Sequence, residues 1–440
     1  MQILTDTEQS NAKSYMLQLM EEVFYKCRSL TGEGAYDTLK MIQREIGIQI
    51  NEIESGKKVF DWTIPEEWNI KDAYVLNSNG EKVIDFKENN LHILNYSSPI
   101  NEVVKFGDLK NHLYTLPNHP NWIPYKTSYY QKNWGFCLSQ NQYDSIFTDD
   151  EEEFHVVIDT TLENGVLRYG ELYIPGKVDQ EILISTYFCH PSMGNDNLSG
   201  VVLATFLGKL LKEKQNFYSY RIIFVPETIG AVTWLYENRD SVNNIKHGFV
   251  LTCVGDKGDL TLKKTRSGNA EVDKVVEYVL SDSGNEYNII DFFPGGSDER
   301  QFSSPGFDLP VCSLMRSMYW TFPEYHTSAD NLEFMEEGKI GETAEYYLRV
   351  FHILENNKFY RNLKPYGEPQ LGKRGLYRMI GANKDQSVEE FFNEMAMLWI
   401  LNYSDNKHTL LDISLKSEIP FNQLLAAANA LIEKGLIIET

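Results

Sequence analysis

The sequence predicts a doubly wound α/β fold with a β-rich insertion and a helical C-terminal unit. From about residue 155, continuous apolar runs alternate with helical stretches, which is typical of a sheet covered by helices on both faces. Between 58 and 150 the runs are short, β-prone and broken by Pro and Asn clusters. We therefore expect a discontinuous main domain at 1–57 and 151–377, an inserted β-rich domain at 58–150 and a third domain at 378–440.

The first part of the main domain, residues 11–48, is predicted to be helical. Apolar residues recur at three- and four-residue spacing in 12–27 and again in 40–47. The stretch between them, 28–39, contains Gly32 and Gly34 and is expected to interrupt the helix.

The second part of the main domain supplies the predicted sheet. Strands are expected at 181–190, 220–227, 247–255 and 309–317, with helices at 197–214 and 231–239 between them. The run at 181–190 is apolar on both faces, as a strand of a covered sheet must be.

Composition excludes several classes of protein. Hydrophobic residues make up 42% of the 440 residues, which excludes a disordered chain. The 41 Lys and Arg face 63 Asp and Glu, and the resulting charge of −22 repels nucleic-acid phosphates and anionic lipids. No run approaches the roughly 20 apolar residues of a membrane span, the N-terminus lacks signal-peptide features, and the five cysteines are scattered without a CxxC. We expect a cytoplasmic protein without membrane contact.

The C-terminal segment 387–440 resembles a winged helix, a module that often binds DNA. From 384 to 440, however, four Lys and no Arg face nine acidic residues. The expected recognition helix, which begins at Phe421, offers a single Lys for phosphates or guanines. We therefore expect protein contact or self-association through this unit, and no nucleic-acid partner.

Polar residues follow the ends of the predicted strands, where open α/β sheets bind ligands. His190 and Asp196 follow the first strand, Glu227 ends the second, and His326 follows the last. His190, Asp196 and His326 form a possible set of three ligands for a catalytic Zn²⁺ with an open fourth position. Glu227 could then accept a proton from water activated by the metal.

Each of these residues also has a structural interpretation. A single His at a strand end is more often a hydrogen-bonded structural residue than a ligand. Asp196 could cap the helix that follows it, and Glu227 could pair with a nearby Lys or Arg. From the residues alone, these alternatives and the metal site remain about equally supported.

The motifs together resemble the zinc aminopeptidases of the M28 clan. The order of His190, the DNLSG segment at 196–200, PETIG at 226–230 and YHTSADN at 325–331 carries the resemblance. It is closest to a bacterial branch with an inserted β-rich domain and a C-terminal winged helix, and it covers nearly the whole chain. It implies an M28-like doubly wound mixed sheet, His190, Asp196 and His326 as metal ligands, and Glu227 as the general base.

The sequence departs from the resembled family at three positions. Ser192, Thr228 and Thr252 stand where such peptidases usually carry acidic residues. Two zinc ions held by two His and one Asp would lack ligands, since each takes about four donors. We therefore expect one zinc, with two possible if Asp298 or Glu299 turns toward the site.

Other polar residues are candidates for orienting the ligands or binding a substrate. Asp330 could orient the His326 imidazole, Tyr325 precedes that histidine, and Arg316 could grip a substrate carboxylate, although an ion pair explains it equally well. A basic cluster (Lys263, Lys264 and Arg266) could attract an anionic group. Aromatic residues of the insertion could stack on a peptide side chain or a sugar ring, or fill a β core: Tyr125, Tyr129, Tyr130, Trp134 and Phe136.

Three functions are consistent with these residues. The first is a zinc-dependent, aminopeptidase-like hydrolase of amide or peptide bonds, acting on a small peptide or another amide-bearing substrate. Since the resembled branch is linked with cell-surface polysaccharide synthesis, the second is an amidase or deacylase on a sugar or sugar–amino-acid conjugate. The third is a non-catalytic metal- or ligand-binding protein that uses its winged helix for interaction.

Overall fold

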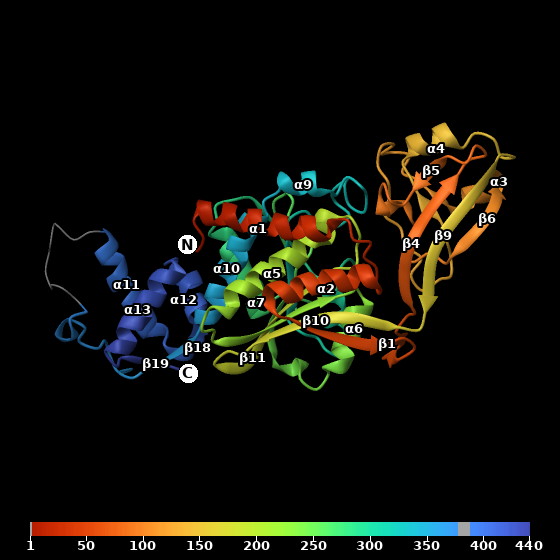
Figure 1. Cartoon of the computed structure of the whole chain (residues 1–440). Coiled ribbons are helices and arrows are strands. Elements are labelled where there is room, and N and C mark those ends of the chain that lie inside the picture. The colour runs from red at the N-terminus through yellow and green to blue at the C-terminus, as the bar shows by residue number, and fades with distance from the viewer. Residues whose placement is uncertain (1, 377–387) are drawn as a thin grey trace. The chain divides into compact units, whose positions relative to one another are not determined.

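The computed structural model describes residues 2–376 and 388–440. The chain divides into two compact units, Leu4–Tyr346 and a second one made mainly of Tyr347–Thr440. Figure 1 shows the helices and strands of both. Among the described residues, no helix has the length and apolar character that crossing a bilayer would require.

An eight-stranded mixed sheet forms the centre of the larger unit. Its order is β1 (Gln49–Glu54), β10 (Val166–Ile174), β12 (Tyr218–Val225), β11 (Val178–Tyr187), β13 (Ile245–Val250), β16 (Val311–Met315), β14 (Leu260–Lys263) and β15 (Tyr287–Ile290). β12, β11, β13 and β16 run parallel to one another. β10 and β14 are antiparallel to their inner neighbours, which makes the sheet mixed. The predicted M28-like α/β fold is therefore confirmed.

In the described part of the chain, eight helices accompany the central sheet. They are α1 (Asp6–Phe24), α2 (Glu33–Ile46), α5 (Ser199–Lys212), α6 (Ile229–Glu237), α7 (Glu271–Ser281), α8 (Glu299–Phe302), α9 (Leu332–Glu336) and α10 (Ile340–Asn356). α1 begins at a capping box in which the Thr5 side chain accepts from the backbone N–H of Glu8 and Glu8 returns a bond.

The second helix starts earlier than the sequence predicts. α2 begins at Glu33, inside the stretch 28–39 that was expected to interrupt the helix. Gly34 lies against the chain just before it, where an added Cβ would come within 2.1 Å of the Cys27 carbonyl oxygen. The glycine therefore serves close packing and does not break the helix.

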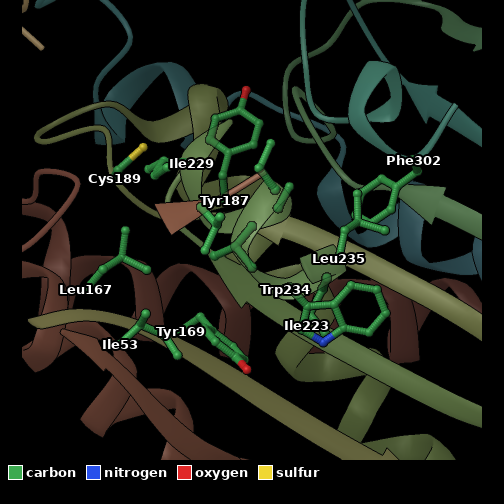
Figure 2. Packing of buried hydrophobic residues seen from close by; sticks show 14 of the residues in the cluster. Ile53, Leu167, Tyr169, Tyr187, Cys189, Ile223, Ile229, Trp234, Leu235 and Phe302 are labelled. Carbon is green, nitrogen blue, oxygen red and sulfur yellow. The ribbon is translucent and has the colours of Figure 1, made fainter. Parts of the chain in front are cut away.

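Alternating residues of the central strands fill two layers of core. On one face, Ile223 of β12 packs in a buried cluster with Leu183, Trp234 and Phe302 (Figure 2). On the other face, Ile222 lies close to Gly208 of α5, where an added Cβ would come within 3.0 Å of its side chain. The strands are apolar on both faces because both faces are covered.

The inserted module has its own antiparallel sheet and core. The strand order is β5 (Lys82–Asp85), β4 (Glu67–Leu76), β9 (Glu153–Glu163) and β6 (Ile100–Lys105), so the sheet uses a strand beyond residue 150. Short elements complete the module: β2 (Lys58–Val59), β3 (Trp62–Thr63), α3 (Phe106–Leu109), β7 (Leu113–Tyr114), β8 (Phe136–Cys137) and α4 (Gln140–Ile146). Phe136 is fully buried in this core and Trp134 packs against it.

The smaller unit contains the predicted winged helix. Its elements are β17 (Phe359–Asn362), α11 (Val388–Tyr403), β18 (Asp405–Thr409), α12 (Leu410–Ser417), α13 (Phe421–Glu433) and β19 (Ile437–Glu439). The three strands form one sheet in the order β18, β17, β19. The boundary predicted between 377 and 378 lies outside the described residues, while β17 already belongs to this unit.

Truncating the central core should be far more costly than truncating an edge strand. Ile223 is fully buried in β12, whereas Ile289 in β15 is 39% exposed. We expect Ile223→Ala to lower the free energy of unfolding by about 2–5 kcal/mol and the matched Ile289→Ala by less than about 1 kcal/mol. Urea unfolding of both variants measures this; equal losses would contradict the assigned core.

Candidate metal centre

Three predicted ligands converge at the carboxyl ends of the parallel strands. His190 follows β11, Asp196 lies in a turn (Gly194–Leu198) that leads into α5, and His326 lies in the loop between β16 and α9. One ligand atom from each lies within 4.8 Å of the others. The Nε2 atom of His326 is 2.8 Å from Asp196 Oδ2, and Nε2 of His190 is 4.0 Å from that same oxygen.

The atoms that face this point are buried without hydrogen-bond partners. Asp196 Oδ2 and His326 Nε2 are 2.8 Å apart, and neither makes a hydrogen bond of normal geometry with any described residue. A buried polar atom without a partner costs free energy unless another group satisfies it. Two imidazoles and one carboxylate are ligands that Zn²⁺ takes in catalytic sites, so these residues fit that ion.

A single carboxylate holds the Asp196 segment in place. The buried Asp330 side chain accepts from the backbone N–H groups of Gly194, Asn195 and Asp196, at 3.1, 2.5 and 2.8 Å. Burial raises the pKa of Asp330 to about 7, although these N–H donors oppose the shift. Asp330 was predicted to orient the His326 ring. Its hydrogen bonds instead hold the backbone of residues 194–196, the segment that carries Asp196.

His190 is held through its backbone by Arg28. The fully buried guanidinium donates to the His190 carbonyl oxygen from Nε at 2.9 Å and from Nη2 at 2.7 Å. It also donates to the carbonyl of Val23, at the end of α1. Burial lowers the pKa of Arg28 to about 10. Arg28 thus ties the first helix to the loop that carries a predicted ligand.

Burial and neighbouring charges keep His190 neutral and Asp196 ionised. Burial lowers the pKa of His190 to about 4, which keeps its imidazole neutral and able to bind a metal. Burial alone would raise the pKa of Asp196, but His190, His326 and the Tyr187 hydroxyl bring it down to about 2. A neutral imidazole and an ionised carboxylate are the forms that coordinate zinc.

The predicted base lies beside the cluster. Glu227 follows β12, and its Oε2 is 3.7 Å from His190 Nε2. Burial, together with the negative charges of Asp298 and Asp196, raises its pKa well above the usual value. A carboxylate with a raised pKa beside a metal cluster is suited to accept a proton at neutral pH.

Hydroxyl groups occupy the three positions where the resemblance would place carboxylates, and each already has a protein partner. Ser192 Oγ donates to the Phe24 carbonyl at 3.2 Å. Thr228 Oγ1 accepts from Arg300 Nη2 at 3.0 Å, and Thr252 Oγ1 lies 2.7 Å from the Tyr187 hydroxyl. These positions offer no charged ligand for a second metal.

The two acidic residues considered for a second metal lie outside the cluster. Asp298 Oδ1 accepts from the backbone N–H of Thr228 at 2.7 Å, and burial raises the pKa of Asp298 to about 7. Glu299 forms a fully buried ion pair with Lys263 and accepts from the Tyr319 hydroxyl. Among the described residues, the only set of three or more potential metal ligands is His190, Asp196 and His326.

The other predicted substrate-binding cations have partners within the protein. Arg316 is buried; its Nε donates to Thr343 Oγ1 and its Nη1 to the Gly258 carbonyl, both at 2.8 Å. Its Nη2 is 3.3 Å from Glu342. The basic cluster separates into three ion pairs: Lys263 with Glu299, Lys264 with Glu277, and Arg266 with Asp308. The prediction that Arg316 or this cluster grips an anionic substrate is not supported by these contacts.

Aromatic rings surround the two histidines. The Tyr325 ring stacks on His326, with centroids 4.0 Å apart and planes 11° apart. The Tyr125 ring, from the inserted module, lies 5.1 Å from His190 and 5.2 Å from His326. The backbone N–H of Tyr125 donates to the His326 carbonyl at 2.8 Å. The insertion therefore forms one wall of the metal centre.

Sequence reasoning missed the roles of Arg28 and Tyr187. Tyr187 ends β11 and donates to Asp196 Oδ1. The sequence shows Arg28 as part of a motif and Tyr187 as part of an apolar run. It does not show their partners, His190 and Asp196. The signal for Arg28 was its place in the RSLTGEG segment at 28–34.

Comparisons with known proteins show the family of the chain. Residues 17–357 match the family described as a domain of unknown function, DUF4910, and residues 358–439 match a winged helix-turn-helix family. A protein of Clostridium acetobutylicum is 55% identical over 419 residues, or 95% of each chain, and its name refers to polysaccharide biosynthesis and an aminopeptidase-like domain. A crystal structure from that organism, with the word peptidase in its name, has a TM-score of 0.91 at 51% identity, covering 99% of this chain and 98% of that chain.

Distant structures show the same fold. A zinc aminopeptidase from Bacillus subtilis has a TM-score of 0.56 at 13% identity, covering 79% of this chain and 94% of its own. An M28 peptidase precursor from Shewanella amazonensis has a TM-score of 0.54 at 12% identity, with 79% and 95% covered. The fold of the larger unit is therefore that of the M28 peptidases.

Shortening the Arg28 side chain should loosen the metal centre. We expect Arg28→Lys to lower the free energy of unfolding by about 1–3 kcal/mol, because one ammonium cannot replace donors to two carbonyls in a buried site. Zinc affinity should fall as well. Arg44→Lys is the matched control, since the Arg44 side chain is 55% exposed in a surface ion pair with Glu22. Urea unfolding and zinc titration test this; equal effects of the two substitutions would contradict the role of Arg28.

Proposed function

The chain belongs to the DUF4910 family, and on its M28 fold and its buried cluster of metal-ligating residues we propose that it is a zinc-dependent hydrolase of amide or peptide bonds. Within this class, we propose the aminopeptidase reaction first. The proposal is carried by one observation: one ligand atom each of His190, Asp196 and His326 lies within 4.8 Å of the others, and Glu227 lies beside them.

In this proposal each residue has a distinct task. His190, Asp196 and His326 hold the zinc, which when bound would polarise the scissile carbonyl and lower the pKa of water. Glu227 accepts the proton from the attacking water and passes it to the leaving amine. Its raised pKa suits it to hold that proton between the two transfers. Tyr125, packed on both imidazoles, limits access of other water to the ligands.

We further propose that one zinc per chain suffices. Three protein ligands with an open fourth position make a complete catalytic site. A second ion would need carboxylates where Thr228 and Thr252 stand, and both hydroxyls are already hydrogen-bonded.

An amidase acting on a sugar conjugate is the second candidate. The relative from Clostridium acetobutylicum supports it, since its name joins polysaccharide biosynthesis with an aminopeptidase-like domain. The chemistry at the metal would be the same, because an amide on an amino sugar and a peptide bond present the same carbonyl. Only the binding surface around the centre would differ.

Removing the proposed base should abolish hydrolysis and spare the metal. We expect Glu227→Gln to lower kcat by about 10²- to 10⁴-fold, the usual contribution of general-base catalysis. Zinc content should stay unchanged, because Glu227 is not among the three ligands. The assay compares hydrolysis of amino-acid amides, dipeptides and N-acyl amino sugars with elemental zinc analysis of the same samples.

Glu213→Gln serves as the matched control, since Glu213 is an exposed residue at the end of α5. It should leave both activity and zinc content unchanged. Full activity of a zinc-loaded Glu227→Gln variant would remove Glu227 from the mechanism. A zinc-loaded wild-type chain that hydrolyses none of these substrates would favour the non-catalytic binding protein.

A further inference from the structure

A second hollow lies beside the hairpin of β2 and β3, apart from the three ligand residues. It is a pocket of roughly 600 Å³, which is within the range of small-molecule sites. Its walls come from the hairpin, from α6 with the turn after it, and from the α8 segment. The lining residues are Phe60, Asp61, Trp62, Val232, Leu235, Arg239, Asp240, Gln301, Ser304, Gly306 and Phe307.

The lining combines exposed aromatic rings with uncommitted polar side chains. Phe60 is 50% exposed and Trp62 is 36% exposed. The carboxylates of Asp61 and Asp240 make no ion pair or hydrogen bond with any described residue. The Gln301 amide likewise has no partner in the described part of the chain.

This combination favours a sugar ring as the occupant. A pyranose has an apolar C–H face that packs on aromatic rings, and its edge carries hydroxyls that need donors and acceptors. Carboxylate and amide side chains accept and donate such bonds. A purely apolar peptide side chain would cover the rings but would desolvate the polar groups without compensation.

A row of aromatic rings connects the pocket with the metal centre. The Trp62 ring lies 5.3 Å from that of Tyr130, which lies 6.4 Å from that of Tyr129. The Tyr129 hydroxyl is 3.0 Å from that of Tyr125, whose ring contacts both ligand histidines. All of these rings come from the inserted module, so one element contributes to both places.

We propose that this pocket is a sugar-binding subsite, and that the inserted module places a sugar portion of the substrate there while another portion reaches the metal centre. The second half of this statement rests on the proposed hydrolase function. The first half does not, because sugar binding in the pocket needs neither zinc nor Glu227. Trp62 and Asp61 are the residues that determine this specificity.

Saturation-transfer NMR on the full-length, metal-free chain tests the subsite with N-acetyl-D-glucosamine and its β-1,4-linked disaccharide as probes. We expect transfer to the sugar ring protons in the wild type. Trp62→Ala should weaken binding about tenfold through loss of the stacking surface. Asp61→Asn, which keeps the size of the side chain, should weaken it as well.

Tyr25→Ala is the matched control, since Tyr25 is a 76% exposed aromatic residue outside the pocket. It should bind both probes as the wild type does. No binding of either sugar by the wild type would overturn the proposal, as would binding that Trp62→Ala and Asp61→Asn leave unchanged. Binding of N-acetylphenylalaninamide at Trp62 without binding of sugar would overturn it in favour of a peptide subsite.

The sugar-binding experiment and the hydrolysis assay together separate the two proposals. If sugar binding depends on Trp62 but the zinc-loaded chain cleaves no amide, the hydrolase function fails and the subsite stands. If the chain cleaves peptides and binds no sugar, the subsite fails and the hydrolase function stands.

Discussion

The carboxylate of Asp330 is the point on which the metal centre depends. It accepts three backbone N–H groups from residues 194–196, and it lies four residues after His326. One side chain therefore joins the loop that carries His326 to the segment that carries Asp196. Arg28 adds the third connection by holding the His190 carbonyl. The ligands meet because loops from three places in the chain are tied together through their backbones.

The number of charged groups around the metal centre is limited by a buried ion pair and by hydroxyl groups. Glu299 and Lys263 neutralise each other in a fully buried pair. Hydroxyls at 192, 228 and 252 add no charge to the cluster. Of the carboxylates in this region, only Asp196 belongs to the set of three ligands and Glu227 lies beside it, an arrangement that suits one divalent cation better than two. The account of a single zinc rests on these partners and not on ligand number alone.

Much of the fold could be predicted because it depends on local patterns. The apolar runs at 181–190, 220–227 and 309–317 locate the central strands, and polar residues after them locate the ligands. Edge strands such as β1 and β15 escaped prediction because they are short and partly exposed, so their sequences carry no continuous apolar run. The start of α2 was placed too late because Gly34 serves a close contact that only the tertiary structure creates.

Some residues of the candidate site could likewise be predicted from the sequence, and others could not. Residue types with metal chemistry, such as His190 and Glu227, stand out in a sequence. Substrate binding by Arg316 and Lys263 stayed open beside an ion pair or a solvated loop, because the sequence does not show their partners, Glu342 and Glu299. Tyr125, which contacts both histidines, comes from the insertion, and its placement depends on the backbone hydrogen bond that it donates to His326. Long-range pairing is the information that one sequence lacks.

The zinc content per chain is the most direct test of the central claim. Elemental analysis should be made on full-length protein purified without chelator or metal-affinity resin, beside an Asp196→Asn variant. The account predicts close to one zinc per wild-type chain and a large loss of zinc in the variant, because Asp196 lies within reach of both histidines. No zinc in the wild type after zinc addition would contradict the metal centre. Two tightly bound ions would contradict the single-zinc account.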